Sequence, residues 1–154
     1  MIRLSIISPG RFGEGPEKAL YEHFAARFAP VGRSASLGPL RLVEVTARKG
    51  MSEHEAVMAA VPPGARLIAL DPRGAAASSE DFARRLAGLR DQGAAELAFL
   101  IGGADGLGPA RDKADFSLSF GAATWPHLLV RGMLAEQLYR CATILVNHPY
   151  HRGG

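Results

Sequence analysis

The chain has almost none of the cysteine that would fix its structure covalently. Cys141 is the only cysteine among its 154 residues. A disulfide within the chain is therefore impossible, and a structural zinc site built on cysteines is excluded as well. One unpaired cysteine is typical of a reducing compartment, so we expect a cytoplasmic protein.

Long apolar runs and targeting signals are also missing. Every uncharged apolar stretch is far shorter than the roughly 20 residues that a membrane span needs, so we expect no membrane segment. Residues 1–7 have no long apolar region with a small-residue cleavage site and are expected to form a first strand rather than a signal peptide. With 47% hydrophobic and 21% charged residues, the sequence predicts one globular domain over residues 1–154.

Several motifs of common enzyme classes are absent. Residues 10–15 and 102–106 lack the G-x-G-x-x-G spacing of dinucleotide sites, and no phosphate-binding G-x-x-x-x-G-K-[ST] loop is present. The nucleophile motif G-x-S-x-G is missing too. His148 and His151 are three residues apart, but no Asp or Glu in the tail completes a ligand set, so we expect no metal. The net charge of +3 permits an anionic partner such as nucleic acid without demanding one.

What the chain does have is an alternation of short apolar runs and amphipathic segments. The runs typical of strands lie at 2–7, 41–46, 66–70, 96–101 and, more weakly, 117–120. The helical segments begin near Pro16, Ser52, Ser78 or Ser79, Pro109 and His127, and the last ends near Leu145. This alternation predicts an α/β fold with a mostly parallel sheet flanked by helices. The stretch 29–40, rich in Pro, Gly and Ser, is expected to be a surface loop.

Three loops that follow predicted strands are candidate ligand sites. Residues 70–74 and 102–106 contain glycines, which let a backbone approach a ligand closely. Ligands of open parallel sheets bind beyond the carboxyl ends of the strands. The alternative is that these glycines only make strand-to-helix turns. The third loop, 120–126, contains the only tryptophan, Trp125, and either wraps an adenine or buries that tryptophan in the core.

The last 28 residues place a long amphipathic helix ahead of a tail that is dense in His, Tyr and Arg. Such side chains grip phosphate and stack on bases. The candidates in this region are Arg131, Tyr139, Arg140, Tyr150, His151 and Arg152. The helix carries a broad apolar surface, which predicts packing on its own sheet and on a second subunit, with a single intrachain face as the alternative.

The order and spacing of these motifs resemble those of one family, the ribosomal RNA large-subunit methyltransferase H family of the SPOUT class. The matching segments, in chain order, are 70–74, 78–83, 101–107, 118–127, 136–140 and 149–152. The resemblance implies an α/β domain whose C-terminal part is tied in a deep trefoil knot. It implies a homodimer and a cofactor, S-adenosylmethionine, that binds in the knot. It also implies methylation of N3 of a pseudouridine in the large-subunit (23S) ribosomal RNA, with the assembled ribosome as the expected substrate.

The same resemblance implies roles for individual residues. The cofactor-binding residues would be Leu70, Gly102, Phe120, Gly121, Ala122, Ala123, Thr124 and Trp125. The tail would complete the site of the partner subunit. His151 would be either the base that accepts the N3 proton or a group that positions the RNA. Tyr150 would stack on a base, and Arg131, Arg140 and Arg152 would contact phosphates.

Three features depart from the family pattern. Ala75 stands where a lysine is common, and residues 121–123 are smaller than usual. Met133 replaces a β-branched residue after Arg131 and Gly132. Two other classes remain as alternatives: a non-catalytic RNA- or ribosome-binding protein with a decayed pocket, and a small α/β hydrolase or nucleotide-binding enzyme. The second would need a nucleophile or a phosphate loop that the sequence does not contain.

Overall fold

A single parallel sheet organises the chain. The structure, a computed structural model, describes residues 1–153. Its five strands are β1 (Ile2–Pro9), β2 (Leu37–Val45), β3 (Arg66–Ala75), β4 (Glu96–Ile101) and β5 (Phe116–Leu118). They lie in the order β2-β1-β4-β3-β5, and every neighbouring pair is parallel. The predicted α/β fold with a mostly parallel sheet is confirmed.

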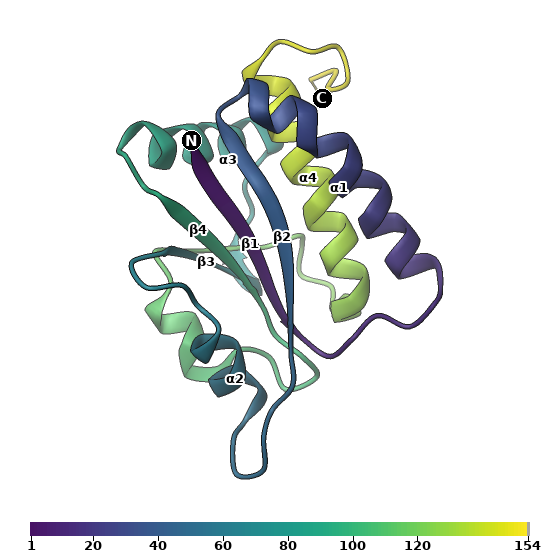
Figure 1. The fold of residues 1–154 in the computed structure, drawn as a ribbon, viewed down its shortest axis with the longest axis vertical. Helices are drawn as coiled ribbons and strands as arrows, with labels where there is room; N and C mark the ends of the chain where they lie inside the picture. The colour runs from purple at the N-terminus through teal and green to yellow at the C-terminus, as the bar shows by residue number, and fades with distance from the viewer. Residues whose placement is uncertain (154) are drawn as a thin grey trace.

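The helices cover the two faces of this sheet unequally (Figure 1). They are α1 (Pro16–Ser34), α2 (Glu53–Ala59), α3 (Ser79–Asp91), the 3-10 helix η1 (Gly108–Lys113) and α4 (His127–Leu145). The long helices α1 and α4 run side by side on one face, with α3 beside them. The short α2 and η1 lie on the other face. The predicted bounds of the last helix agree with those observed.

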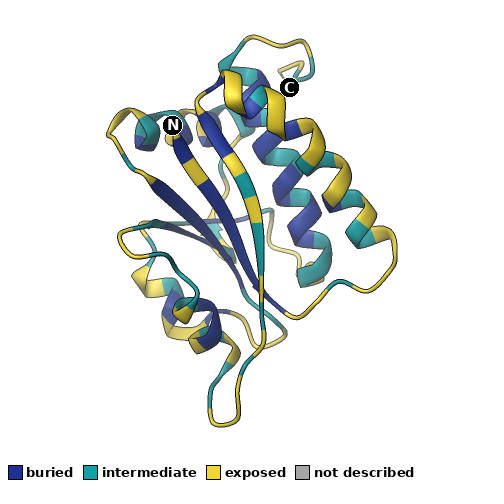
Figure 2. Ribbon diagram, in the orientation of Figure 1, coloured by how far each residue is buried: buried dark blue, intermediate teal, exposed yellow. Residues whose placement is uncertain are grey.

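Strand residues alternate between two hydrophobic clusters, one on each face. Ile68 and Phe99 point toward α1, α3 and α4, where they pack with Leu134. Val57 of α2 packs with Leu100 on the opposite face. Both faces of the central strands are therefore buried, as Figure 2 shows in dark blue, and this is why residues 97–101 of β4 are all apolar.

The stretch 29–40 is not a surface loop, so that prediction is wrong. Helix α1 continues through Pro30 to Ser34, and β2 already begins at Leu37. Pro30 removes one helical hydrogen bond, but tertiary packing outweighs this loss. Phe28 is 1% exposed and lies against Gly32, where a Cβ would approach the phenyl ring to 2.5 Å. Packing of this kind depends on distant parts of the chain and leaves no local signal.

Helices α2 and α3 begin at the predicted caps. Ser52 and Glu55 form the expected capping box, in which the serine hydroxyl accepts from the Glu55 backbone N–H at 3.2 Å and the carboxylate accepts from the Ser52 N–H. Ser78 caps α3 by accepting from the Asp81 N–H at 3.1 Å. Across residues 1–153, no helix combines the length and apolarity needed to cross a membrane.

Candidate functional site

A cavity of about 470 Å³ lies beyond the carboxyl ends of β3, β4 and β5. This is within the usual size range of small-molecule sites. The segments that the sequence indicated as ligand sites form its walls: 70–72 in the second half of β3, 101–107 from the end of β4, and 118–127 from the end of β5. Val130 of α4 closes the remaining side. Three segments that are far apart in the sequence thus meet at one edge of the sheet.

Glycines form much of the cavity wall. Gly106 and Gly121 have φ angles of +74° and +109°, which glycine adopts without strain. A Cβ built on either residue meets no atom within 4 Å, so there is open space beside both. Their N–H groups bond within the loops, that of Gly106 to the Gly103 carbonyl and that of Gly121 to Ser119 Oγ, each at 3.0 Å. Gly102 has the opposite role: a Cβ there would lie 2.5 Å from the backbone of Gly106, so the turn closes only because Gly102 has no side chain.

Asp71 connects two walls of the cavity. Its Oδ1 accepts from the Arg73 backbone N–H at 2.8 Å, and its Oδ2 lies 3.3 Å from Nη1 of Arg111 in η1. Burial raises the pKa of the Asp71 carboxyl, but the Arg73 N–H and the two arginine charges outweigh burial and lower it. The carboxylate is therefore ionised at neutral pH and holds the β3 loop against η1.

The far end of α4 carries the C-terminal tail, away from this cavity. His127 and Val130 line the cavity at the start of the helix, and the tail begins after Leu145. Nineteen helical residues place the two ends about 28 Å apart. The tail therefore lies outside the cavity of its own chain, and Figure 1 shows the C-terminus at the opposite end of α4.

Tyr150 folds back onto α4 and α1. Its hydroxyl donates to Oε1 of Glu136 at 3.0 Å, and its ring meets that of Tyr139 edge-on at 4.6 Å. The guanidinium of Arg140 lies 4.9 Å from the ring centre and that of Arg27 lies 5.9 Å away. Burial and the Glu136 carboxylate both raise the pKa of the Tyr150 hydroxyl. The ring that was predicted to stack on a base is thus packed within its own chain, between cations.

His151 lies between a carboxylate and a cation. Its Nε2 is 2.7 Å from Oε1 of Glu80 in α3, and its Nδ1 is 3.1 Å from Nη1 of Arg140. A guanidinium can only donate, so Nδ1 accepts and Nε2 carries the proton that is donated to Glu80. Arg140 also pairs with Glu136 at 2.6 Å, the i, i+4 pair that the sequence predicted. Arg152, at the end of the tail, is exposed.

Arg131 is enclosed by its own chain. Its side chain is 0% exposed, so the predicted contact with a phosphate would require this region to open, and the role stays a prediction. It donates to Ser8 Oγ, to the carbonyl oxygens of Pro9 and Gly10, and to Glu44 at 2.8 Å. Burial lowers the pKa of this guanidinium, and the Glu44 carboxylate opposes that shift. Arg131 therefore joins the start of α4 to the ends of β1 and β2.

Comparison with known proteins gives one consistent result. The family described as predicted SPOUT methyltransferase matches residues 2–151. The ribosomal RNA large subunit methyltransferase H of Ruegeria pomeroyi is 55% identical over 155 residues, which cover 98% of this chain and 99% of that protein. The protein of the same name from Roseobacter denitrificans is 56% identical with the same coverage.

The chain belongs to the ribosomal RNA large subunit methyltransferase H family, in the SPOUT class. The solved structure of a probable methyltransferase from Bordetella pertussis Tohama I shares the fold, with a TM-score of 0.53. Its identity is 15%, and the match covers 92% of this chain and 95% of that one.

Within this family setting, the cavity contains seven of the eight residues predicted to bind a cofactor. Those residues are Leu70, Gly102, Phe120, Gly121, Ala123, Thr124 and Trp125, whereas Ala122 is exposed outside the lining. Trp125 is 43% exposed at the cavity, so it is not a core residue. No local pattern indicates that Val130 closes the wall, because its place in the apolar stripe of α4 is equally typical of core packing.

In residues 1–153, no group of three or more His, Cys, Asp or Glu side chains is arranged to hold a metal ion. His148 instead accepts from the Tyr150 backbone N–H through Nδ1 at 3.1 Å, which shapes the tail.

Proposed function

We propose that this protein transfers a methyl group from S-adenosylmethionine to N3 of a pseudouridine in large-subunit ribosomal RNA, on the assembled ribosome in the cytoplasm. Membership of the methyltransferase H family supports the reaction class and the RNA substrate. The observation that carries the proposal is the cavity at the carboxyl edge of the sheet, lined by the three loops at which the family motifs occur.

The cavity suits a nucleoside with a charged side group. Apolar side chains of Leu70, Ile101, Leu107, Leu118 and Val130 line it. Gly106 and Gly121 have open space where a side chain would stand, so an adenine or an amino acid group can approach the backbone closely there. Bound there, S-adenosylmethionine would supply an activated methyl group. The work of the chain is then to hold the two reactants in line and to exclude water.

A second subunit would complete the site. The tail lies at the opposite end of α4 from the cavity of its own chain, so only a partner's tail can approach that cavity. An apolar groove between α1, α4 and residues 76–79 shares Phe120 and Gly121 with the cavity. Leu20, Phe24 and Met133 line this groove. Its position next to the cavity supports a homodimer in which this face is covered by the partner.

We also propose that the cofactor loops form the trefoil knot of the SPOUT class. Two segments in this region cross at close range. Ser119 Oγ donates to the Pro72 carbonyl at 3.1 Å, and the Ser119 N–H donates to the Ala75 carbonyl at 2.9 Å. At Gly74, a Cβ would come within 2.8 Å of Ser117, so the crossing requires glycine. A tight crossing between the β3 loop and the chain leading to α4 supports a threaded arrangement.

His151 is the candidate acceptor for the N3 proton. Glu80 holds the imidazole as its Nε2–H tautomer, which leaves Nδ1 as the basic atom. A carboxylate in this position also stabilises the imidazolium that forms on proton transfer. Nη1 of Arg140 lies 3.1 Å from Nδ1 of His151 and donates to it. The RNA therefore has to displace this guanidinium before His151 accepts a proton. A displaced Arg140 is then free to contact a phosphate, and Tyr150 lies beside it. The exposed Arg152 is the other candidate for a phosphate contact.

Methyl transfer to RNA tests the proposal directly. Ribosomes and naked ribosomal RNA, both from cells lacking this protein, are incubated with it and labelled S-adenosylmethionine. We expect label at N3 of one pseudouridine, with ribosomes the better acceptor. Label at another position or on a ribose would contradict the assigned acceptor atom. If neither acceptor is labelled although the folded protein binds ribosomes, the protein is a non-catalytic ribosome-binding protein instead.

A further inference from the structure

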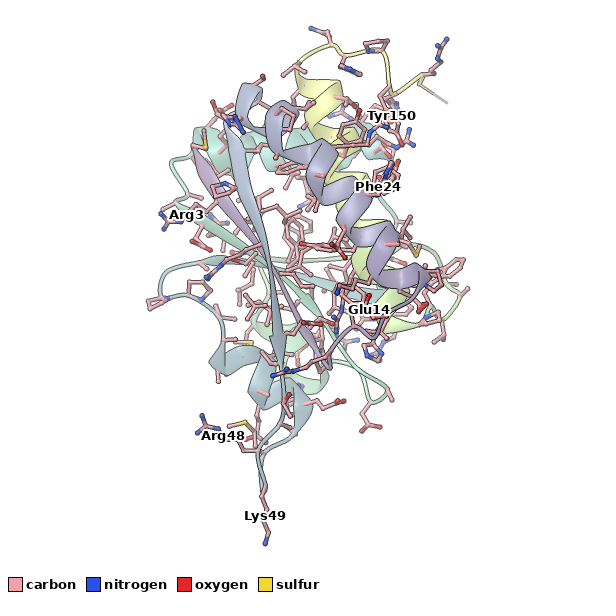
Figure 3. All side chains as sticks on the ribbon, turned by 45° about the vertical axis from the view of Figure 1, so that its right-hand side comes forward. Arg3, Glu14, Phe24, Arg48, Lys49 and Tyr150 are labelled. Carbon is pink, nitrogen blue, oxygen red and sulfur yellow. The ribbon has the colours of Figure 1, made fainter. Side chains whose placement is uncertain are left out.

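The turn between β2 and α2 presents two adjacent cations. Arg48 and Lys49 are both exposed, and both project from one end of the molecule in Figure 3. Within residues 1–153, neither side chain takes part in an ion pair. By contrast, Arg66 and Arg111 each pair with a carboxylate. The two charges on this turn are therefore available to a partner.

This turn has a defined shape. The Met51 N–H donates to the Arg48 carbonyl at 2.9 Å, which closes a four-residue turn. Gly50 takes the third position with a φ of +82°, a conformation that glycine adopts without strain. The next residue, Ser52, begins the capping box of α2. Both ends of the cationic segment are thus fixed by hydrogen bonds, and ordering it on a partner costs little conformational entropy.

The nearest acidic side chains are engaged elsewhere. Glu55 accepts from the hydroxyl and the backbone N–H of Ser52. The hydrogen bonds from Ser52 lower the pKa of the Glu55 carboxyl, so it stays ionised within the cap. The Glu53 carboxylate lies against Gly103, on the wall of the cavity. Neither carboxylate neutralises the turn.

The contact between Glu53 and Gly103 places the turn close to the cavity. Glu53 touches a cavity residue, and Arg48 is five residues before Glu53, a separation that spans at most about 18 Å of chain. Bases of a stacked strand are about 3.4 Å apart, so this distance corresponds to about five nucleotides. An RNA strand with one nucleotide at the cavity therefore has its flanking phosphates within reach of Arg48 and Lys49.

We propose that the Arg48–Met51 turn is a phosphate-contacting element that binds the ribosomal RNA strand flanking the methylated nucleotide. The inference rests on the proposed function for the identity of the RNA. Arg48 and Lys49 contact phosphate oxygens and carry no sequence information, so they set affinity and orientation while the cavity selects the base. The turn compensates for the absence of a separate RNA-binding domain within residues 1–153.

The test compares Arg48→Ala, Lys49→Ala and the double variant with the wild type in three measurements. These are the Kd for large ribosomal subunits, the kinetics of methyl transfer, and the Kd for S-adenosylmethionine. We expect the ribosome Kd and the KM for ribosomes to rise on the order of fivefold for each cation removed, with kcat and cofactor binding unchanged. The slope of log Kd against log salt concentration should fall by about one for each lost contact.

Two control variants distinguish a specific effect of this turn on ribosome binding from an effect of the net charge of the protein. Arg48→Lys combined with Lys49→Arg keeps both charges and should bind ribosomes as the wild type does. Arg33→Ala removes an exposed cation from the last turn of α1 and should leave binding unchanged. An equal loss in Arg33→Ala would mean that only net charge matters and would overturn the proposal.

The binding measurement does not depend on catalysis. If the wild-type protein binds ribosomes through the turn but transfers no methyl group, this inference stands and the proposed reaction is refuted. Active protein whose ribosome Kd and salt slope are unchanged in the double variant would refute the inference and keep the reaction. Wild-type protein that neither binds ribosomes nor methylates them refutes both.

Discussion

Arg131 of α4 and Glu44 of β2 form an ion pair of 2.8 Å in which the arginine side chain has no exposed surface. The guanidinium also donates to two backbone carbonyls at the end of β1 and lies 4.7 Å from the ring centre of Phe12. One side chain thus fixes the start of α4, which forms one wall of the cavity, to the two strands at the other side of the sheet.

Arg131→Met should destabilise the protein strongly. The substitution leaves the buried Pro9 carbonyl and Ser8 hydroxyl without their donor, and each buried group left unsatisfied costs about 1–3 kcal/mol. The free energy of unfolding in urea measures this loss. Arg140→Met is the matched control, because its ion pair with Glu136 is partly exposed and should cost less. Equal losses in the two variants would show that burial of Arg131 does not set its contribution.

Gly102→Ala should weaken cofactor binding at least tenfold. The added Cβ would lie 2.5 Å from the Gly106 backbone, so the loop after β4 has to shift and the cavity wall moves with it. Calorimetric titration with S-adenosylmethionine measures the Kd. The control is Gly88→Ala in α3, where a Cβ meets nothing within 4 Å. That change should leave the Kd unchanged and stabilise the helix by about 0.5–1 kcal/mol. Unchanged binding in Gly102→Ala would exclude this loop from the cofactor site.

Glu80→Gln should separate a base from a positioning role for His151. If the carboxylate stabilises a protonated His151, its loss should lower kcat about tenfold or more at unchanged cofactor Kd. His151→Ala should then lower kcat to a similar extent. Asp81→Asn, in the same turn of α3, is the control and should have wild-type kcat. Full activity of Glu80→Gln beside an inactive His151→Ala would indicate that His151 only positions the RNA.

Acid should destabilise the protein partly through Glu96. Burial raises the pKa of this carboxyl, but hydrogen bonds from Arg3 and Ser5, together with the charges of Arg3 and Arg41, outweigh burial and lower it. A carboxyl with a lowered pKa in the folded state stabilises the protein above its ordinary pKa of about 4.3. That contribution is lost as the pH falls through the folded value.

Urea unfolding between pH 3 and pH 7 tests this linkage. The wild type should lose stability below about pH 4.5, whereas Glu96→Gln should be less stable at pH 7 and should lose less on acidification. Parallel pH curves for the two proteins would mean that other carboxyl groups account for the acid sensitivity.

Much of the fold could be predicted because its signals are local. The capping box at Ser52 and the apolar stripe of α4 depend on residues three or four positions apart, and the structure places both elements as predicted. The cavity loops were predictable for a related reason: the carboxyl ends of parallel strands share one edge.

The remaining features depend on contacts between distant residues. Pro30 lies within a helix because Phe28 packs against Gly32 and β2, and no local rule indicates this. The burial of Arg131 results from partners more than 80 residues away, and the position of His151 results from Glu80, 71 residues away. An arginine that follows a candidate ligand loop is typical of a phosphate contact, so the sequence alone does not indicate that Arg131 is buried.

Helix α4 fills the centre of the larger hydrophobic cluster, where Leu134, Leu138 and Cys141 have no exposed surface. It is also the last element in chain order. During synthesis, which runs from the N-terminus, the part of this face between α1 and α3 consequently stays uncovered until these residues emerge. Nascent chains stalled before α4 should be recognised by chaperones and cleaved by proteases, whereas chains that include α4 should resist both. The stability of the earlier elements therefore depends on a helix that is made after all of them.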